Sequence, residues 1–162
     1  MLLRSRRDRW RGAALFALLL LLLCFQLAGC GPSDPVAEIR ELHAAGRFAD
    51  SLEPLRGLVE ARPDDVEVHY LYGLALLRSG QPSLALWSLR KAMEHPDWLV
   101  PAALQLAAGA LATGNHEEAM GAAGRILEVE PDHLEALLLR AHARVESRRD
   151  YEGALADADR VL

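Results

Sequence analysis

The sequence predicts an all-α chain built from repeated helix pairs, and three observations lead to this. From Cys30 onward the chain is rich in Ala, Leu, Arg and Glu and poor in Val, Ile and Thr, which favours helix over strand. Gly46, Gly80 and Gly114 lie 34 residues apart. Three prolines, each followed by an aspartate, recur at nearly the same period: Pro63, Pro96 and Pro131. Stacked helix pairs produce such a period, whereas an ordinary helical bundle has no need of one.

The first 29 residues predict an export leader that is removed. The basic start "MLLRSRRDRWR" precedes an apolar run of thirteen residues, 13–25, which is shorter than the roughly 20 residues of a spanning helix. The tetrapeptide Leu27-Ala28-Gly29-Cys30 resembles the lipobox of bacterial lipoproteins. That resemblance implies cleavage before Cys30 and lipidation of its thiol. An ordinary signal peptide or a short membrane anchor is the alternative, and the paired arginines of "SRRDRW" leave a twin-arginine export route open.

Removal of the leader changes both the thiol content and the charge of the chain. Cys24 lies in the leader and Cys30 takes the lipid, so we expect no disulfide, cysteine metal site or thiol catalyst in the mature protein. The leader holds five basic and one acidic side chain of the 18 basic and 23 acidic in the whole, which leaves 13 and 22 and a net charge of −9. Such an acidic chain repels phosphate backbones, so nucleic acid is not an expected partner.

The repeats divide the chain into four units, 32–65, 66–99, 100–133 and 134–162. The second unit, "VEVHYLYGLALLRSGQPSLALWSLRKAMEHP", shows the pattern best, and the whole pattern resembles the tetratricopeptide repeat. The resemblance implies a right-handed solenoid of about four helix-turn-helix units over 36–162, behind a signal peptide (1–29) and a lipidated tether (30–35). The first unit is degenerate and the last incomplete. The positions that carry the pattern are Gly46, Gly73, Gly80, Ala85, Ala92, Gly114, Ala119, Pro131, Tyr151 and Ala154.

Each of these residue types has a physical role in a helix pair. The small residues allow two helices to cross closely, and the turn glycines can take a positive φ. Proline ends the second helix of a unit, and the aspartate after it can cap the next helix. Leu162 falls within the second helix of the last unit with no polar closing helix after it. We therefore expect either a fragment of a longer chain or a partner that covers the last face.

No catalytic or metal-binding pattern stands out, and we expect neither an enzyme nor a bound metal or cofactor. No two histidines have the i, i+4 spacing of a zinc helix, and "HEEAM" at His116 lacks the second histidine. His116 instead occupies the place where the repeat usually has an aromatic residue. The glycines between 109 and 124 are too scattered for a phosphate-binding loop.

The family resemblance implies a concave groove on the first helices of successive units, where a peptide or helix binds. Mapped onto this sequence, the groove residues are Glu67, Tyr70, Leu74, Leu77, Leu104, Ala108, Leu111, Leu138 and His142. Chaperone-binding members grip a terminal carboxylate there with Lys, Arg and Asn, and this set contains none of them. A mostly apolar groove suggests an amphipathic or extended apolar partner segment. Alternatively, some of the leucines pack within the solenoid. Trp87, on a second helix, is a rival docking residue, although we expect it to be buried between units.

Two kinds of function fit these observations. The first is a lipid-anchored periplasmic scaffold or adaptor for envelope assembly, similar in layout to pilotins or to adaptors of envelope enzymes. Its membrane partner is the lipid on Cys30, and Gly31 in place of an aspartate favours the outer membrane. The second is the amino-terminal recognition arm of a longer envelope enzyme.

The lipobox makes a direct prediction about the anchor. Cys30→Ser should abolish palmitate labelling and release the protein from membranes, because serine offers no thiol to the lipid. Several acyl chains anchor stably, since each buried CH₂ contributes about 0.8 kcal/mol and one chain alone is marginal. Membrane fractionation and labelling measure both effects. A Cys30→Ser protein that stays membrane-bound and uncleaved would identify 13–25 as a true anchor instead.

Overall fold

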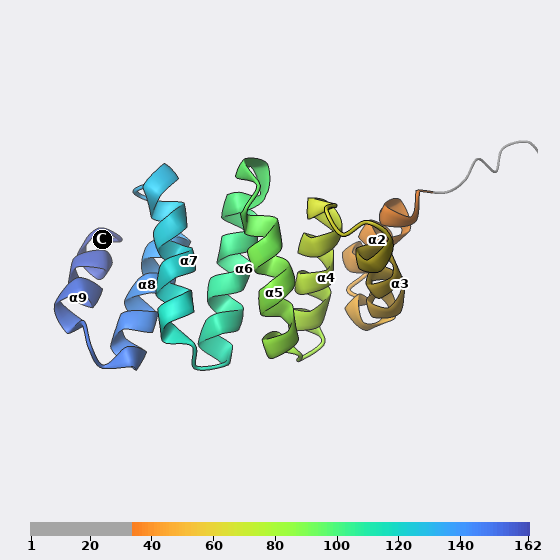
Figure 1. The fold of residues 1–162 in the computed structure, drawn as a ribbon. Coiled ribbons are helices and arrows are strands. Elements are labelled where there is room, and N and C mark those ends of the chain that lie inside the picture. Colours follow the sequence, from red (N-terminus) through yellow and green to blue (C-terminus); the bar gives the residue numbers. More distant parts are fainter. Residues whose placement is uncertain (1–33) are drawn as a thin grey trace, which may run out of the picture. The chain divides into compact units, whose positions relative to one another are not determined.

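The computed structural model describes residues 34–162, and these residues form helices joined by short turns (Figure 1), with no strand in this part of the chain. The leader and Cys30 lie outside the described residues. Two units are distinguished, 1–37 and 38–162, and only the start of one helix is described in the first. None of the described helices is long and apolar enough to cross a membrane. The helices are α2 (Pro35–Ala44), α3 (Phe48–Ala61), α4 (Val66–Arg78), α5 (Pro82–Met93), η1 (Pro96–Trp98), α6 (Leu99–Ala112), α7 (His116–Val129), α8 (Leu134–Ser147) and α9 (Tyr151–Asp159).

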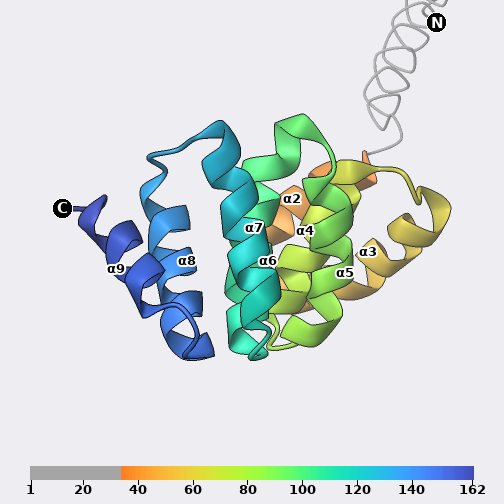
Figure 2. The same cartoon turned by 60° about the vertical axis from the view of Figure 1, so that its left-hand side comes forward.

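Within residues 38–162 each helix from α3 to α9 packs against the next one in the sequence, as Figures 1 and 2 show. The alternate helices α4, α6 and α8 also contact one another in that order. This arrangement confirms the predicted all-α solenoid of helix pairs. The number of repeat units and their boundaries stay predictions.

The turns inside the helix pairs follow the predicted glycine period. Gly46, Gly80 and Gly114 have φ values of 71°, 75° and 73°, in the left-handed region that glycine enters without a steric cost. The next position at the same period is Arg148, which takes a φ of 56° without the help of glycine. The fourth turn therefore keeps the backbone conformation of the other three, although arginine replaces the glycine that the other three turns share.

The expectation that the aspartate after each proline between helix pairs caps the next helix is wrong. After Pro63 and Pro131 the cap lies one residue later, and Pro96 belongs to η1, after which α6 has no side-chain cap. Pro63 and Asp64 occupy the middle of a turn that a backbone hydrogen bond closes, so neither can serve as the cap. Asp65 caps α4 by accepting a hydrogen bond of 3.2 Å from the backbone N–H of the helix. His133, which follows Pro131-Asp132, caps α8 through its ring nitrogen in the same way.

Small residues lie where the helices cross, as the sequence predicts. Ala85 and Ala92 of α5 are fully buried, together with Leu89 between them. Gly73 of α4 faces this row, and a Cβ added to it would lie 2.5 Å from Leu89 Cγ. Because Leu89 has no exposed surface, it has little room to move away. The contact between α4 and α5 therefore requires glycine at position 73.

This contact predicts opposite effects for two glycine-to-alanine changes. Alanine normally favours a helix over glycine by about 1 kcal/mol. Gly73→Ala should nevertheless lower the free energy of unfolding by about 1–3 kcal/mol, because the new methyl group overpacks the crossing at Leu89. Gly121→Ala, in α7 with no atom near its added Cβ, should raise it by about 0.5–1 kcal/mol. Urea titration of both variants measures the difference, and stabilisation by Gly73→Ala would show that α4 and α5 do not cross there.

Candidate functional site

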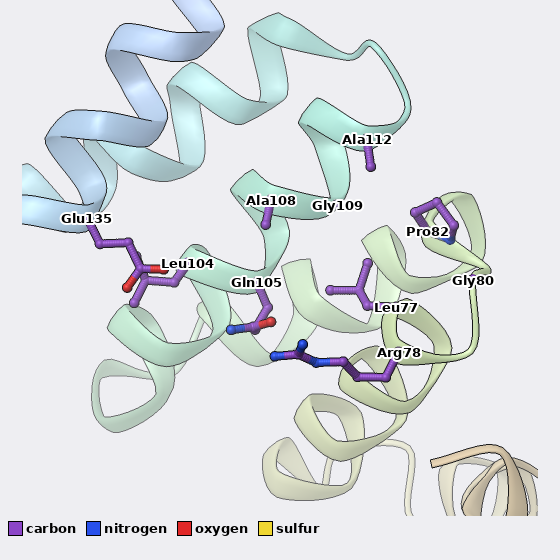
Figure 3. A pocket seen from close by; sticks show the side chains of 10 residues that line it. All are labelled: Leu77, Arg78, Gly80, Pro82, Leu104, Gln105, Ala108, Gly109, Ala112 and Glu135. Atoms are coloured by element: carbon purple, nitrogen blue, oxygen red, sulfur yellow. The ribbon is translucent and has the colours of Figure 1, made fainter. Parts of the chain in front are cut away.

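A pocket of about 570 Å³ lies on the helices that the sequence assigns to the groove (Figure 3). Helix α4 and the turn after it form one wall, α6 forms the floor, and the first turn of α8 contributes the far side. The lining is mostly apolar, with two charged side chains and one amide. The lining residues are Leu77, Arg78, Gly80, Pro82, Leu104, Gln105, Ala108, Gly109, Ala112 and Glu135.

The floor of the pocket is shaped by small residues on α6. Gly109 is buried beneath α4, and a Cβ added to it would lie 2.8 Å from Leu77 Cδ2. Ala108 and Ala112 stand one helical turn apart beside Gly109, and both are exposed. Because neither fills the space above the helix, a depression remains where larger side chains would have closed the surface.

The two charged groups of the pocket have opposite signs and lie on opposite sides of it. Figure 3 shows Arg78 at one side, Glu135 at the other and Gln105 between them. Within residues 34–162 neither the guanidinium of Arg78 nor the carboxylate of Glu135 forms a hydrogen bond or an ion pair. Arg78 acts electrostatically on Tyr70: burial raises the pKa of the Tyr70 phenol, and the positive charge of Arg78 opposes that rise.

Three of the predicted groove residues line this pocket, namely Leu77, Leu104 and Ala108. On α4, three others lie outside it. The Glu67 carboxylate is paired with Arg40 (Nε–Oε1 2.7 Å), and Leu74 is half-buried away from the pocket. The Tyr70 ring packs against Trp98 with 4.8 Å between centroids, and it also contacts the core.

The remaining three predicted residues are separate from the pocket as well. Leu111 packs on a small cluster of alanines between α6, α7 and α8. Leu138 is exposed on α8, and the His142 ring lies 3.9 Å from the Glu146 carboxylate of its own helix. The alternative that some groove leucines pack within the solenoid therefore describes Leu111 well.

Sequence reasoning did not assign Arg78, Gln105 and Glu135 to the groove, so the pocket includes an arginine that the predicted set lacks. Arg78 follows Leu77 directly and ends α4, so a shift of one position along the same helix would have included it. The remaining pocket residues that the sequence did not assign to the groove are Gly80, Pro82, Gly109 and Ala112. Of these, Ala112 could have been inferred from Ala108, which lies one helical turn before it.

Trp87 is not buried between units, and that expectation is wrong. The side chain is 58% exposed and stands beside the equally exposed Leu84 on α5. The buried residues of this helix are Ala85, Ser88, Leu89 and Ala92, and Trp87 is not one of them. One edge of the indole packs on the buried His69 ring, with 5.1 Å between centroids.

Ionisable groups are also concentrated between α8 and α9, and the sequence reasoning did not find this cluster. Asp157 of α9 is only 2% exposed. Arg140 binds it with two hydrogen bonds of 2.8 and 2.6 Å, and Arg144 adds one of 2.6 Å. Arg144 also pairs with Asp150 at 2.9 Å. Since every oxygen of the Asp157 carboxylate is occupied by an arginine of the same chain, the cluster holds α9 on α8 and offers no free group for catalysis.

A serine and a histidine meet at the start of α3, but their hydrogen bonds do not suit a nucleophile. The Ser51 hydroxyl is buried and donates to the Phe48 carbonyl (2.7 Å). The same hydroxyl lies 3.0 Å from His43 Nε2, and with its proton directed at the Phe48 carbonyl it can only accept from that nitrogen. Burial lowers the pKa of His43. Among residues 34–162 no group of three His, Cys, Asp or Glu is placed to hold a metal ion.

Comparison with known proteins shows the fold. No family model matches the sequence, and no curated protein matches it. A crystal structure of MamA protein superimposes with a TM-score of 0.70 at 18% identity, over 76% of this chain and 67% of that one. MamA from Desulfovibrio magneticus RS-1, from residue 41 to its end, gives 0.68 at 17% identity, over 81% and 76%. At these identities the likeness confirms a tetratricopeptide-type helical solenoid.

The arginine cluster predicts a stability that depends on pH in acid. Burial alone would raise the pKa of Asp157, but the hydrogen bonds and charges of Arg140 and Arg144 outweigh it and hold the pKa below its usual range. The stabilisation is therefore complete above the unfolded-state pKa of about 4 and is lost as the pH falls through the lower folded value. Asp157→Asn should cost about 1–3 kcal/mol of unfolding free energy at pH 7, because it leaves Arg140 without a carboxylate and Arg144 with Asp150 alone.

Urea titrations of both proteins between pH 7 and pH 2 test this dependence. The gap between wild type and Asp157→Asn should stay constant down to about pH 4 and shrink below it, since a protonated Asp157 binds arginine no better than asparagine does. Asp132→Asn is the control, because its pair with Arg160 is exposed and should contribute less than about 0.5 kcal/mol. A gap of the same size at pH 2 would mean that the charge of Asp157 contributes nothing.

Proposed function

We propose that this protein is a lipid-anchored adaptor of the bacterial envelope that holds a segment of a partner protein in the pocket between α4, α6 and α8. The observation that carries the proposal is the pocket itself, an open hollow with small residues on its floor. The tetratricopeptide-type fold supports it, because stacked helix pairs expose a continuous surface of first helices suited to long, narrow ligands.

The lining of the pocket fits a peptide segment. Leu77, Leu104 and the alanines of α6 offer apolar contact, and the small floor leaves space for an inserted side chain. Burying one Leu-sized side chain there contributes roughly 1.5–3 kcal/mol. The amide of Gln105 can bond to the backbone of an extended segment, since an amide both donates and accepts. Such a contact is largely apolar, and binding should survive raised salt.

The location in this proposal rests on the sequence of the leader. The lipobox Leu27-Ala28-Gly29-Cys30 supports a lipid anchor, and Gly31 supports the outer membrane, with the helices facing the periplasm. The net charge of −9 after cleavage disfavours nucleic acid and anionic headgroups as further ligands of the helices. The partners in this setting are envelope proteins, as for a pilotin or for an adaptor of an envelope enzyme.

Filling the pocket tests the proposal. Ala108→Trp places an indole over the floor at an exposed position, so it should weaken peptide binding at least about tenfold while leaving the fold intact. Peptides selected on the full wild-type chain from a random 12-residue display library serve as the probe, with dissociation constants measured by fluorescence anisotropy.

Ala156→Trp is the matched control, because Ala156 is also exposed in a helix but lies outside the pocket. It should leave the dissociation constants unchanged. Circular dichroism checks that both variants keep their helices. If every selected peptide binds Ala108→Trp as well as wild type, the pocket is not the binding site and the proposed function fails.

A further inference from the structure

We infer that the segment held in the pocket is charge-polarised: it places a carboxylate against Arg78 and a basic side chain against Glu135, with apolar side chains between them. This inference rests on the proposed function and specifies the partner. It fixes the direction in which a given segment lies, because the reverse placement would bring like charges together at both sides.

Arg78 differs from most other arginines of the described chain. Of the twelve arginines in residues 34–162, ten are within ion-pair distance of a carboxylate: Arg40, Arg47, Arg56, Arg62, Arg90, Arg125, Arg140, Arg144, Arg149 and Arg160. Arg78 has no such partner there, although carboxylates greatly outnumber arginines in this part of the chain. Arg148, the other exception, lies in a turn outside the pocket. The guanidinium of Arg78 is therefore available to a carboxylate from outside, with which it can form two parallel hydrogen bonds.

Glu135 provides the opposite charge across the floor. Its carboxylate also has no ion pair or hydrogen bond in the described residues, and it lies in the first turn of α8. Figure 3 shows it beyond Leu104, on the side of the pocket away from Arg78. A bound segment that reaches across the α6 floor meets both charges. Gln105, between them, is neutral and can bond to the backbone of the segment in either direction.

Other charge patterns fit less well. A wholly acidic segment is opposed by Glu135 and by the net charge of the chain, and a wholly basic one is opposed by Arg78. An uncharged apolar segment can occupy the floor, but it leaves both charges unused and gains no direction. Charges at the rim of an interface contribute more to partner choice than to affinity. Because Arg78 and Glu135 are both exposed, each contact should change the dissociation constant by about fivefold.

A charge reversal at one side of the pocket tests the inference. Peptides are selected from the random 12-residue library on the full wild-type chain and on Arg78→Glu. The wild type should enrich an acidic and a basic residue at a fixed spacing, and Arg78→Glu should enrich two basic residues at that spacing. Arg78→Gln alone should remove the enrichment for the acid and weaken binding of a wild-type peptide about fivefold, less so in about 0.5 M NaCl.

The control is Arg125→Glu on α7, an exposed arginine outside the pocket. It should select the same peptides as wild type. If the wild type and Arg78→Glu select peptides with the same charges, and those peptides lose binding to Ala108→Trp, the inference is wrong while the proposed function stands. Selected peptides that bind Ala108→Trp normally would overturn both.

Discussion

The close approach of α4 to its two neighbours is the constraint on which the pocket depends. Glycine stands at both crossings: Gly73 lies against Leu89 of α5, and Gly109 of α6 lies against Leu77 of α4. At each point a single added Cβ would come within 3 Å of a leucine side chain. The first crossing fixes α4 on its own hairpin, and the second brings the next first helix alongside it. Only then does the surface beside Gly109 become the floor of a pocket with α4 as its wall.

The sequence predicted those parts of the fold that repeat, because repetition distinguishes a structural requirement from chance. The glycine period located the turns, and even Arg148 keeps the left-handed backbone that the period requires. The pairing of Pro and Asp was interpreted wrongly because the two residues act locally. They form a turn, and the capping role passes to Asp65. A residue pattern shows that a boundary exists more reliably than it shows which atom makes the bond.

The candidate site was predicted only in part, and the reason is geometric. Leu77, Leu104 and Ala108 were found because each lies on the side of a first helix that the repeat pattern assigns to the groove, although Leu77 and Leu104 also pack on the core. Glu135 enters the pocket because α8 lies beside α6, and the lateral offset between two helices cannot be read from either one. The arginine cluster, in contrast, could have been predicted from the sequence. Arg140 lies 34 residues after the buried Leu106, so the repeat period places a charged residue at a position that is buried in the preceding unit.

The exposed Trp87 and the pocket offer two surfaces for a partner, and their shapes favour the pocket. Trp87 and Leu84 project from one helix, and the indole is fixed along one edge by His69. A partner can cover such a pair, but only a flat apolar face would fit against it. The pocket, in contrast, has walls from two helices and a floor that admits a side chain, and it carries two charges of opposite sign that have no partner within residues 34–162. The hollow gives apolar contact and the two charges fix how a segment lies in it, so a segment that discriminates between surfaces should choose the pocket.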